Sequence, residues 1–233
     1  MDAKKRAAEG TIPFLRNKSL IGLGAGSTIA HLVEILNEHK NETPVKYLTS
    51  SFNTLQLLRK YDFDVIPINS VAAIDIYVDG CDQVDRNLNA LKSGGGIHTS
   101  EKLLASMAKE FIIVGDEGKY VDDFDSRFPV VIDVLPEAFN FVLAQLAMLY
   151  PGVKTALRLS DKKDGPVITD HGNYLVDIWF QSWPELSGLN LTLKSITGII
   201  ETSLFCDLAH KAILTGKDDI RILENPKPRN SHA

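Results

Sequence analysis

The first 120 residues alternate short apolar segments with segments of helical periodicity, and this alternation restricts the chain to few architectures. Strands are expected at residues 20–23, 45–48, 65–68, 74–78 and 111–114. Helices are expected in IAHLVEILNEH, from the Thr49-Ser50-Ser51 caps to Leu58, and from about Thr99 to Ala108. Short apolar strands that alternate with helices predict right-handed βαβ units around a parallel sheet.

The pattern changes after Lys119. Strand-like residues 128–134 precede a helical stretch at 136–149 and strand-like segments at 154–159, 167–169 and 172–177. This order predicts a small α+β unit beside the main sheet. Segments 199–205 and 211–215 are expected to return the chain to the first domain. The predicted domains are therefore 1–125 with about 203–233, and about 126–202.

The two ends of the chain carry weaker signals. A short helix is expected from Asp2 to Glu9, ended near Gly10 and Pro13. The tail ENPKPRNSHA has no apolar periodicity and is expected to be mobile.

Composition excludes several classes of protein. With 44% hydrophobic and 24% charged residues, the chain has the composition of an ordinary globular protein. Its net charge of -5 argues against nonspecific binding to nucleic acid or membrane surfaces. Cys81 and Cys206 provide neither a disulfide framework nor metal-ligand spacing. No segment has the apolar length of a signal peptide core or a membrane span, so a cytoplasmic protein is expected.

The glycine-rich turn GLGAGST, residues 22–28, lies between an expected strand and an expected helix. Glycines allow an anion to approach the backbone, and the helix N-terminus offers free N–H groups. Ser27 and Thr28 add hydroxyl donors. The turn is not the dinucleotide fingerprint, because Ser27 occupies the third glycine position. Phosphate binding and a plain strand–helix turn with a serine N-cap both remain open.

Two carboxylates follow another expected strand in Asp79-Gly80-Cys81-Asp82. Ligands of open α/β sheets bind beyond the C-terminal ends of strands, and close carboxylates suit acid–base chemistry. The alternative is an Asp-Gly turn in which Asp82 only caps a loop. No metal site is expected, because no histidine or third acid has ligand spacing here.

The segment Lys92-Ser93-Gly94-Gly95-Gly96 is the most informative one. Successive glycines cost backbone entropy, which is explained if their N–H groups line a ligand, and Lys92 can neutralise a phosphate or an oxyanion. A flexible surface loop is the alternative. Glu101 falls in the first turn of the next helix, where the helix dipole alone explains it. Burial would be needed for Glu101 to work as a base. Because it follows Lys92 and the glycines in the sequence, Glu101 is the best candidate for the base.

Several segments of the chain together resemble one known family. DIYVDGCDQVD, KSGGGIHTSEK and FIIVGDEGKYV, with GLGAGST upstream, resemble ribose-5-phosphate isomerase of the A type. ITDHGNYLVD and GIIETSLF resemble later segments of that family, so the likeness reaches about Leu223. It implies a Rossmann-like α/β domain with a smaller α+β (ferredoxin-like) domain, in a homodimer. The implied reaction interconverts ribose 5-phosphate and ribulose 5-phosphate in the non-oxidative pentose phosphate pathway, without metal or cofactor.

The resemblance also assigns roles to individual residues. It implies that Glu101 is the proton-shuttling base of a cis-enediolate mechanism, with Asp79, Asp82 and Lys92 around the sugar. The implied substrate-binding positions are Gly26, Ser27, Thr28, Gly94, Gly95 and Lys119. The chain departs from the family pattern at Ala25, usually threonine, at Ser93, usually glycine, and at Ile97-His98, usually a small residue followed by leucine.

Two other functions are alternatives to this one. An isomerase for another sugar phosphate, such as an amino-sugar phosphate isomerase-deaminase, is disfavoured by Glu101 and Lys92 in the KSGGG context. A non-catalytic sugar-phosphate sensor would normally carry a helix-turn-helix, for which no room is expected before Ser19. Such a sensor would also not need Glu101.

Overall fold

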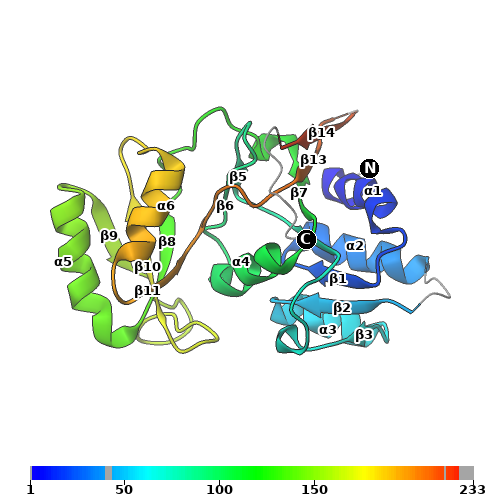
Figure 1. Ribbon diagram of the computed structural model, residues 1–233, viewed down its shortest axis with the longest axis horizontal. Helices are drawn as coiled ribbons and strands as arrows, with labels where there is room; N and C mark the ends of the chain where they lie inside the picture. Colours follow the sequence, from blue (N-terminus) through cyan, green and yellow to red (C-terminus); the bar gives the residue numbers. More distant parts are fainter. Residues whose placement is uncertain (1, 40–43, 218, 226–233) are drawn as a thin grey trace. The chain divides into compact units, whose positions relative to one another are not determined.

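The computed structural model describes residues 2–39, 44–217 and 219–225. Its chain forms two compact units (Figure 1). The larger unit comprises Met1–Ala90, Ser100–Asp122 and Asp207–Ala233, and the smaller unit comprises Leu91–Thr99 and Asp123–Cys206. The domain limits expected from the sequence placed 91–99 in the larger unit. This segment instead groups with the smaller one, where Lys92 N–H donates to Ser203 O (3.0 Å) and the Ser93 hydroxyl to Pro129 O (2.5 Å).

The larger unit is built on a seven-stranded sheet in the order β14-β13-β7-β4-β1-β2-β3. Its strands are β1 (Leu20–Leu23), β2 (Lys46–Thr49), β3 (Asp64–Val65), β4 (Ile76–Asp79), β7 (Phe111–Asp116), β13 (Lys211–Thr215) and β14 (Ile220–Glu224). All neighbours are parallel except β13 and β14. The predicted Rossmann-like α/β class is thereby confirmed.

The helices of this unit are α1 (Ala3–Leu15), α2 (Ser27–Glu38), α3 (Phe52–Lys60) and α4 (His98–Met107), with 3-10 turns η1 (Ile68–Ser70) and η2 (Glu117–Lys119). The first two residues of α4 group with the smaller unit. Helices α1 and α2 run side by side (Figure 1). Ser51 is the N-cap of α3 and accepts a hydrogen bond from Thr54 N–H (3.2 Å). Among the described residues, no helix has the length and apolar content needed to cross a membrane.

The direction of chain winding reverses between β1 and β4. From β1 the chain continues to β2 and β3 on one side, whereas β4 and then β7 lie on the other side. The loops that leave β1 and β4 therefore diverge, and ligands of open parallel sheets bind at such a switch point. Every residue of β4 is buried, as expected for a central strand covered on both faces.

Helix α1 differs from the prediction because it continues through Gly10 and Pro13 to Leu15. The face that includes Ala7, Ala8 and Leu15 is buried in the core. Gly10 packs against the sheet, since a Cβ there would lie 3.1 Å from Ile213 Cγ2. Tertiary packing thus overrides the weak local helix-breaking signal.

The end of the chain also differs from the prediction. Residues 220–224 form the edge strand β14, which pairs with β13. The remainder of the expected mobile tail, residues 226–233, lies outside the described residues. Short strands β5 (Gln83–Val84), β6 (Ala90–Leu91) and β12 (Leu204–Phe205) were not expected.

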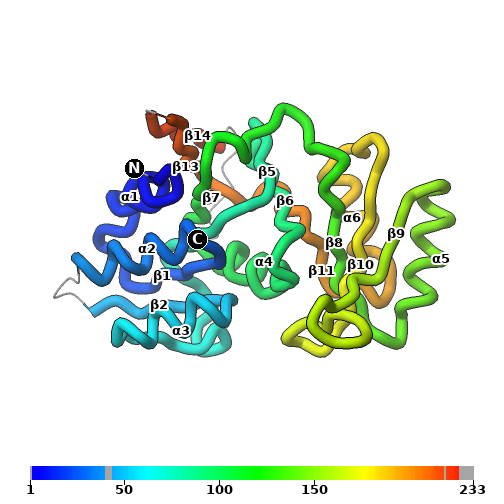
Figure 2. The backbone as a smooth tube through the Cα atoms, turned by 180° about the vertical axis from the view of Figure 1, so that it is seen from behind, coloured from blue at the N-terminus to red at the C-terminus, as the bar shows by residue number. Residues whose placement is uncertain are grey.

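The smaller unit contains an antiparallel sheet in the order β11-β8-β10-β9. Its elements are β8 (Val130–Val134), η3 (Pro136–Ala138), α5 (Phe139–Leu149), β9 (Lys154–Leu157), β10 (Tyr174–Trp179), α6 (Leu186–Ser195) and β11 (Ile199–Thr202). The order β-α-β-β-α-β, which can be followed in Figure 2, is the split βαβ arrangement of ferredoxin-like domains. The expected smaller α+β domain is confirmed.

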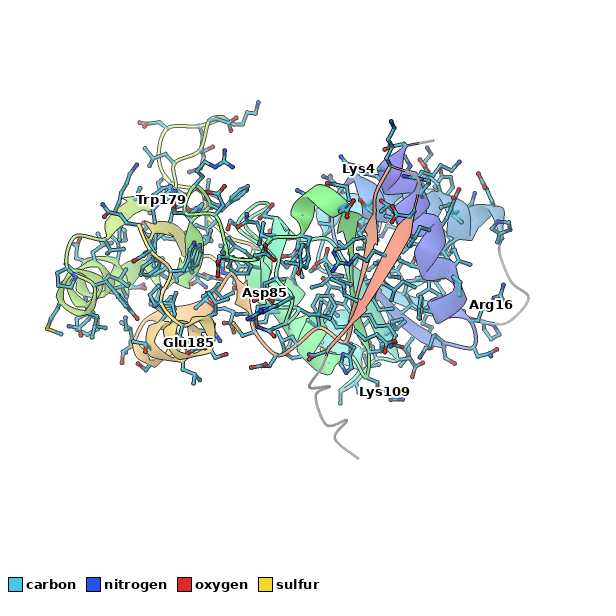
Figure 3. All side chains as sticks on the ribbon, turned by 90° about the horizontal axis from the view of Figure 1, so that it is seen from above. Lys4, Arg16, Asp85, Lys109, Trp179 and Glu185 are labelled. Carbon is cyan, nitrogen blue, oxygen red and sulfur yellow. The ribbon has the colours of Figure 1, made fainter. Side chains whose placement is uncertain are left out.

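Two details of the smaller unit were missed. Residues 199–202 form β11 of this sheet instead of returning the chain to the larger unit. Helix α6 was not predicted, although the Glu185 side chain (Figure 3) caps it by accepting from Ser187 N–H (2.9 Å) and Gly188 N–H (2.5 Å). Capping by glutamate is unusual, so the sequence lacks the common start signal of a helix.

Candidate active site

The loop between β1 and α2 is fixed by its neighbours. Gly24 N–H donates to Val78 O (2.9 Å), and Gly24 O accepts from the Thr54 hydroxyl (2.7 Å). The N-cap of α2 is Gly26, which has φ +92° and no side-chain cap. Gly26 and Ser27 are exposed, whereas Thr28 is buried. An uncapped helix start that reaches solvent is suited to binding an anion.

The other two glycines of GLGAGST, Gly22 and Gly24, lie against side chains of β4. Gly22 pairs with Tyr77 across β1 and β4, and a Cβ on Gly22 would lie 2.8 Å from Tyr77 Cδ2. A Cβ on Gly24 would lie 1.9 Å from the carboxyl carbon of Asp79. These two glycines therefore make room for side chains of β4, and only Gly26 has a left-handed backbone conformation suited to the turn.

Asp79 is held from three directions at the switch point. Its side chain is 0% exposed. Oδ1 accepts from Ala25 N–H (3.0 Å) and Gly80 N–H (2.8 Å), and Oδ2 accepts from the Tyr77 hydroxyl (2.7 Å). A buried carboxyl group needs such hydrogen-bond partners for its oxygens. The contact with residue 25 is made by its backbone, so the departure at Ala25 leaves it intact.

Glu101 belongs to the same charged cluster. It lies in the first turn of α4 and is 6% exposed, so it meets the condition of burial that a base at this position requires. Burial raises the pKa of Tyr77 well above its ordinary value, and the negative charges of Asp79 and Glu101 raise it further. Both carboxylates therefore act on one tyrosine hydroxyl.

Asp82 and Lys119 follow the neighbouring strands β4 and β7. Both are half-buried, and Lys119 lies in η2. Strands β7, β4 and β1 are adjacent and parallel, so the loops that carry Lys119, Asp82 and Ser27 leave the same edge of the sheet. The loop after β5 is held by Asp85 (Figure 3). The Asp85 side chain accepts hydrogen bonds from Asn87 N–H (2.8 Å) and Asn89 N–H (2.8 Å).

The smaller unit contains the predicted lysine and the glycine loop. Lys92 is 8% exposed, and its Nζ lies 5.8 Å from the centre of the Phe205 ring. Gly94 and Gly95 are exposed, while a Cβ on Gly96 would lie 2.8 Å from Leu175 Cδ1. Packing against Leu175 therefore explains the glycine at position 96. Gly94 and Gly95 leave exposed backbone that a ligand can approach. The Ser93 hydroxyl anchors the loop by donating to Pro129 O.

Arg158 is a second anchor of this loop that sequence reasoning missed. Its Nη2 donates to Ser93 O (2.9 Å), and its Nε donates to Asp177 Oδ2 (3.2 Å). The pair with Asp177 is largely buried, with 21% and 14% of the two side chains exposed. No local motif marks Arg158, because its partners are 65 and 19 residues away in the sequence.

Arg158→Lys is expected to loosen the glycine loop, because an ammonium group cannot reproduce the fork between Ser93 O and Asp177. A hydrogen bond from a charged donor contributes about 1.5–3 kcal/mol, so we expect a lower Tm and faster amide exchange at residues 92–97. Hydrogen exchange read by mass spectrometry measures this directly. Arg127→Lys is the matched control, since the Arg127–Asp125 pair is exposed. Equal exchange in both variants would contradict the anchoring role.

Ile97 and His98, where the sequence departs from the expected family pattern, belong to the smaller unit. His98 is buried, with Nε2 3.4 Å from Glu201 O. The adjacent Thr99 hydroxyl donates to Asp133 Oδ2 (2.6 Å), and burial raises the pKa of Asp133.

Within the described ranges, no group of three histidine, cysteine or acidic side chains is arranged to hold a metal ion.

Tyr77 is the principal residue of the larger unit's cluster that was missed. One signal was present: Tyr77 precedes Asp79 by two positions in a strand, so both side chains point to the same face. A tyrosine inside an otherwise aliphatic central strand requires a partner for its hydroxyl.

Comparisons with known proteins agree with this architecture. The family of ribose 5-phosphate isomerase A (phosphoriboisomerase A) matches residues 46–219. Ribose-5-phosphate isomerase A of Pyrococcus horikoshii is 34% identical over 226 residues, covering 96% of this chain and 98% of the relative. The solved ribose 5-phosphate isomerase A of Methanocaldococcus jannaschii superposes with a TM-score of 0.88 at 30% identity, covering 96% and 98% of the two chains. A D-ribose-5-phosphate isomerase structure in complex with phospho-erythronic acid gives a TM-score of 0.89 at 34% identity, covering 96% and 100%. The chain therefore belongs to the ribose 5-phosphate isomerase A family.

Proposed function

We propose that this protein is an aldose–ketose isomerase that interconverts D-ribose 5-phosphate and D-ribulose 5-phosphate. The observation that carries the proposal is the family match, which extends over residues 46–219 and is accompanied by relatives of that name along nearly the whole chain. The neighbour in complex with phospho-erythronic acid supports a phosphorylated sugar as the ligand. The buried carboxylates Asp79 and Glu101 supply the acid–base groups that such a reaction needs.

In the proposed mechanism Glu101 removes the proton from C2 of the open-chain aldose and returns it to C1. The intermediate is a cis-enediolate, whose oxyanion is stabilised by Lys92 and the amides of Gly94 and Gly95. A positioned base contributes about 10²–10⁴ in rate, and an oxyanion donor about 10²–10³. Asp79 or Asp82 exchanges the hydroxyl protons of the sugar, and Asp79 is oriented by hydrogen bonds from Ala25 N–H, Gly80 N–H and the Tyr77 hydroxyl.

The remaining predicted residues bind the substrate. The uncapped start of α2 at Gly26, Ser27 and Thr28 supplies N–H and hydroxyl donors for anionic or hydroxyl groups of the sugar phosphate. Lys119 supplies a positive charge from the loop after β7. The family resemblance further supports a cytoplasmic homodimer in the non-oxidative pentose phosphate pathway that needs neither metal nor cofactor.

The test is turnover of ribose 5-phosphate by the purified protein in the presence of EDTA, followed by NMR. We expect ribulose 5-phosphate to form at the same rate with and without EDTA. Loss of turnover on chelation would contradict metal-independent chemistry. Turnover of an amino-sugar phosphate in place of ribose 5-phosphate would favour the related isomerase. Calorimetric binding of ribose 5-phosphate without turnover would favour a sensor.

A further inference from the structure

The helix that carries the proposed base is held near its start by a side-chain contact with strand β8. Helix α4 begins at His98, and Glu101 lies in its first turn. The Thr99 hydroxyl, at the second position of the helix, donates to Asp133 Oδ2 on β8 (2.6 Å). The first N–H groups of a helix have no partner within the helix, so the first turn depends on other contacts for its order. The contact with Asp133 therefore holds the turn that contains Glu101.

Asp133 is an exception among the residues of its strand. Strand β8 lies between β10 and β11, and its other four residues are valine or isoleucine with 0% exposure. Asp133 is 1% exposed and pairs with Leu175 and Glu201 on the two neighbouring strands. An apolar residue at this position would avoid the free-energy cost of burying a carboxyl group. Stability alone therefore does not explain Asp133, and departures of this kind are expected at functional sites.

The surroundings of Asp133 give its carboxyl group a fixed orientation. Burial raises the pKa of Asp133, whereas the hydrogen bonds from Thr99 and Asn173 lower it and so offset part of the rise. Asn173 is itself 6% exposed and lies in the turn before β10, where its N–H donates to Thr169 Oγ1 (3.1 Å). Asp133 is thus held by the sheet and by Asn173, and it can in turn hold the start of α4.

We propose that Thr99 and Asp133 are positioning residues for the isomerisation: their hydrogen bond orients the first turn of α4 and thereby places Glu101. Thr99 and Glu101 are two positions apart in one helical turn, so a shift of the backbone at Thr99 also moves Glu101. Misplacing a catalytic group by about 1 Å can cost about 10²-fold in rate. This inference rests on the proposed function, because only turnover with Glu101 as base connects the contact to rate.

Thr99→Val tests the inference, since it removes the hydroxyl and keeps the shape of the side chain. We expect kcat for ribose 5-phosphate to fall by about 10- to 100-fold and KM to change by less than about twofold, because the contact places the base and does not bind substrate. Thr99→Ser retains the hydroxyl and should retain the wild-type kcat. The matched control is Thr202→Val on β11: Thr202 is 0% exposed, and its hydroxyl donates to Asn190 Oδ1 on α6 (2.5 Å). This control should lower Tm and keep the wild-type kcat.

A double variant separates positioning from stability. Thr99→Val together with Asp133→Leu replaces both partners by apolar groups of similar size, a change that can be nearly neutral for stability. We expect Tm to stay near that of the wild type, while kcat stays as low as in Thr99→Val. If kcat recovers together with Tm, the contact is only structural and the positioning role is wrong. The role is also wrong if Thr99→Val alone keeps the wild-type kcat.

The connection with Glu101 is tested in a Glu101→Gln background. Once the base is absent its placement no longer matters, so Thr99→Val should lower the residual rate no further. A second loss of about tenfold in this background would show that the contact acts on a different group, and would overturn the inference. Wild-type protein that folds but does not turn over ribose 5-phosphate would overturn the proposed function, and this inference with it.

Discussion

Glu101→Gln is expected to lower kcat/KM for ribose 5-phosphate by about 10²–10⁴, the usual contribution of a positioned general base. The amide is similar in size to the carboxylate, so the first turn of α4 and its packing are preserved, but the amide cannot accept the C2 proton. Exchange of that proton with deuterium from solvent, followed by NMR, measures the proton-transfer step separately from product formation. Both rates are expected to fall together.

Glu110→Gln is the matched control for this substitution. Glu110 precedes β7 at the opposite edge of the sheet from Lys119 and pairs with Lys18 (3.4 Å) and Lys211 (3.6 Å). Half-exposed ion pairs of this kind contribute about 0–1 kcal/mol, so turnover should remain at the wild-type level. Proton exchange that survives in Glu101→Gln would move the base to another residue, with Asp79 or Asp82 the next candidate.

The fold class could be predicted from the sequence because a doubly wound sheet has a strong local signal. Its central strands are apolar along their whole length, as in Ile76-Tyr77-Val78, and each is followed by a turn or a helix. The ends of β1, β4 and β7 could be predicted as site positions for the same reason, since ligands bind beyond parallel strands. The family resemblance, now confirmed, supplied the roles of individual residues, and those roles stay predictions.

The features that the sequence did not predict depend on strand register and on contacts between residues that are far apart in the sequence. A glycine before a helix has the same local pattern whether it binds an anion or makes room for a side chain of the next strand. Only the pairing of Gly22 with Tyr77 distinguishes the two roles. The Arg158 contact with Ser93 likewise joins positions 65 residues apart. Helix α1 passed its expected end because Gly10 packs against Ile213, a contact with the other end of the chain.

Gly24→Ala is expected to be the most destabilising small substitution near the site. The added Cβ would lie 1.9 Å from both Cγ and Oδ1 of Asp79, a distance that real Cβ atoms do not show. Asp79 is fully buried and held by three donors, so either its hydrogen bonds break or β1 and β4 separate. Overpacking costs about 1–3 kcal/mol, and breaking bonds to a buried charge adds about 1–3 kcal/mol. A fall in Tm of at least about 6 °C is expected in calorimetry.

Two further variants show whether this cost comes from the contact with Asp79. Gly80→Ala is the control, since its Cβ would be 3.8 Å from Val114 O, an ordinary contact, and Tm should stay near that of the wild type. In an Asp79→Ala background the carboxyl group is absent, so Gly24→Ala should cost much less than in the wild type. Such non-additivity is expected only for residues in direct contact. If Gly24→Ala costs the same in both backgrounds, its effect arises from the backbone of the loop, and Gly24 does not make room for Asp79.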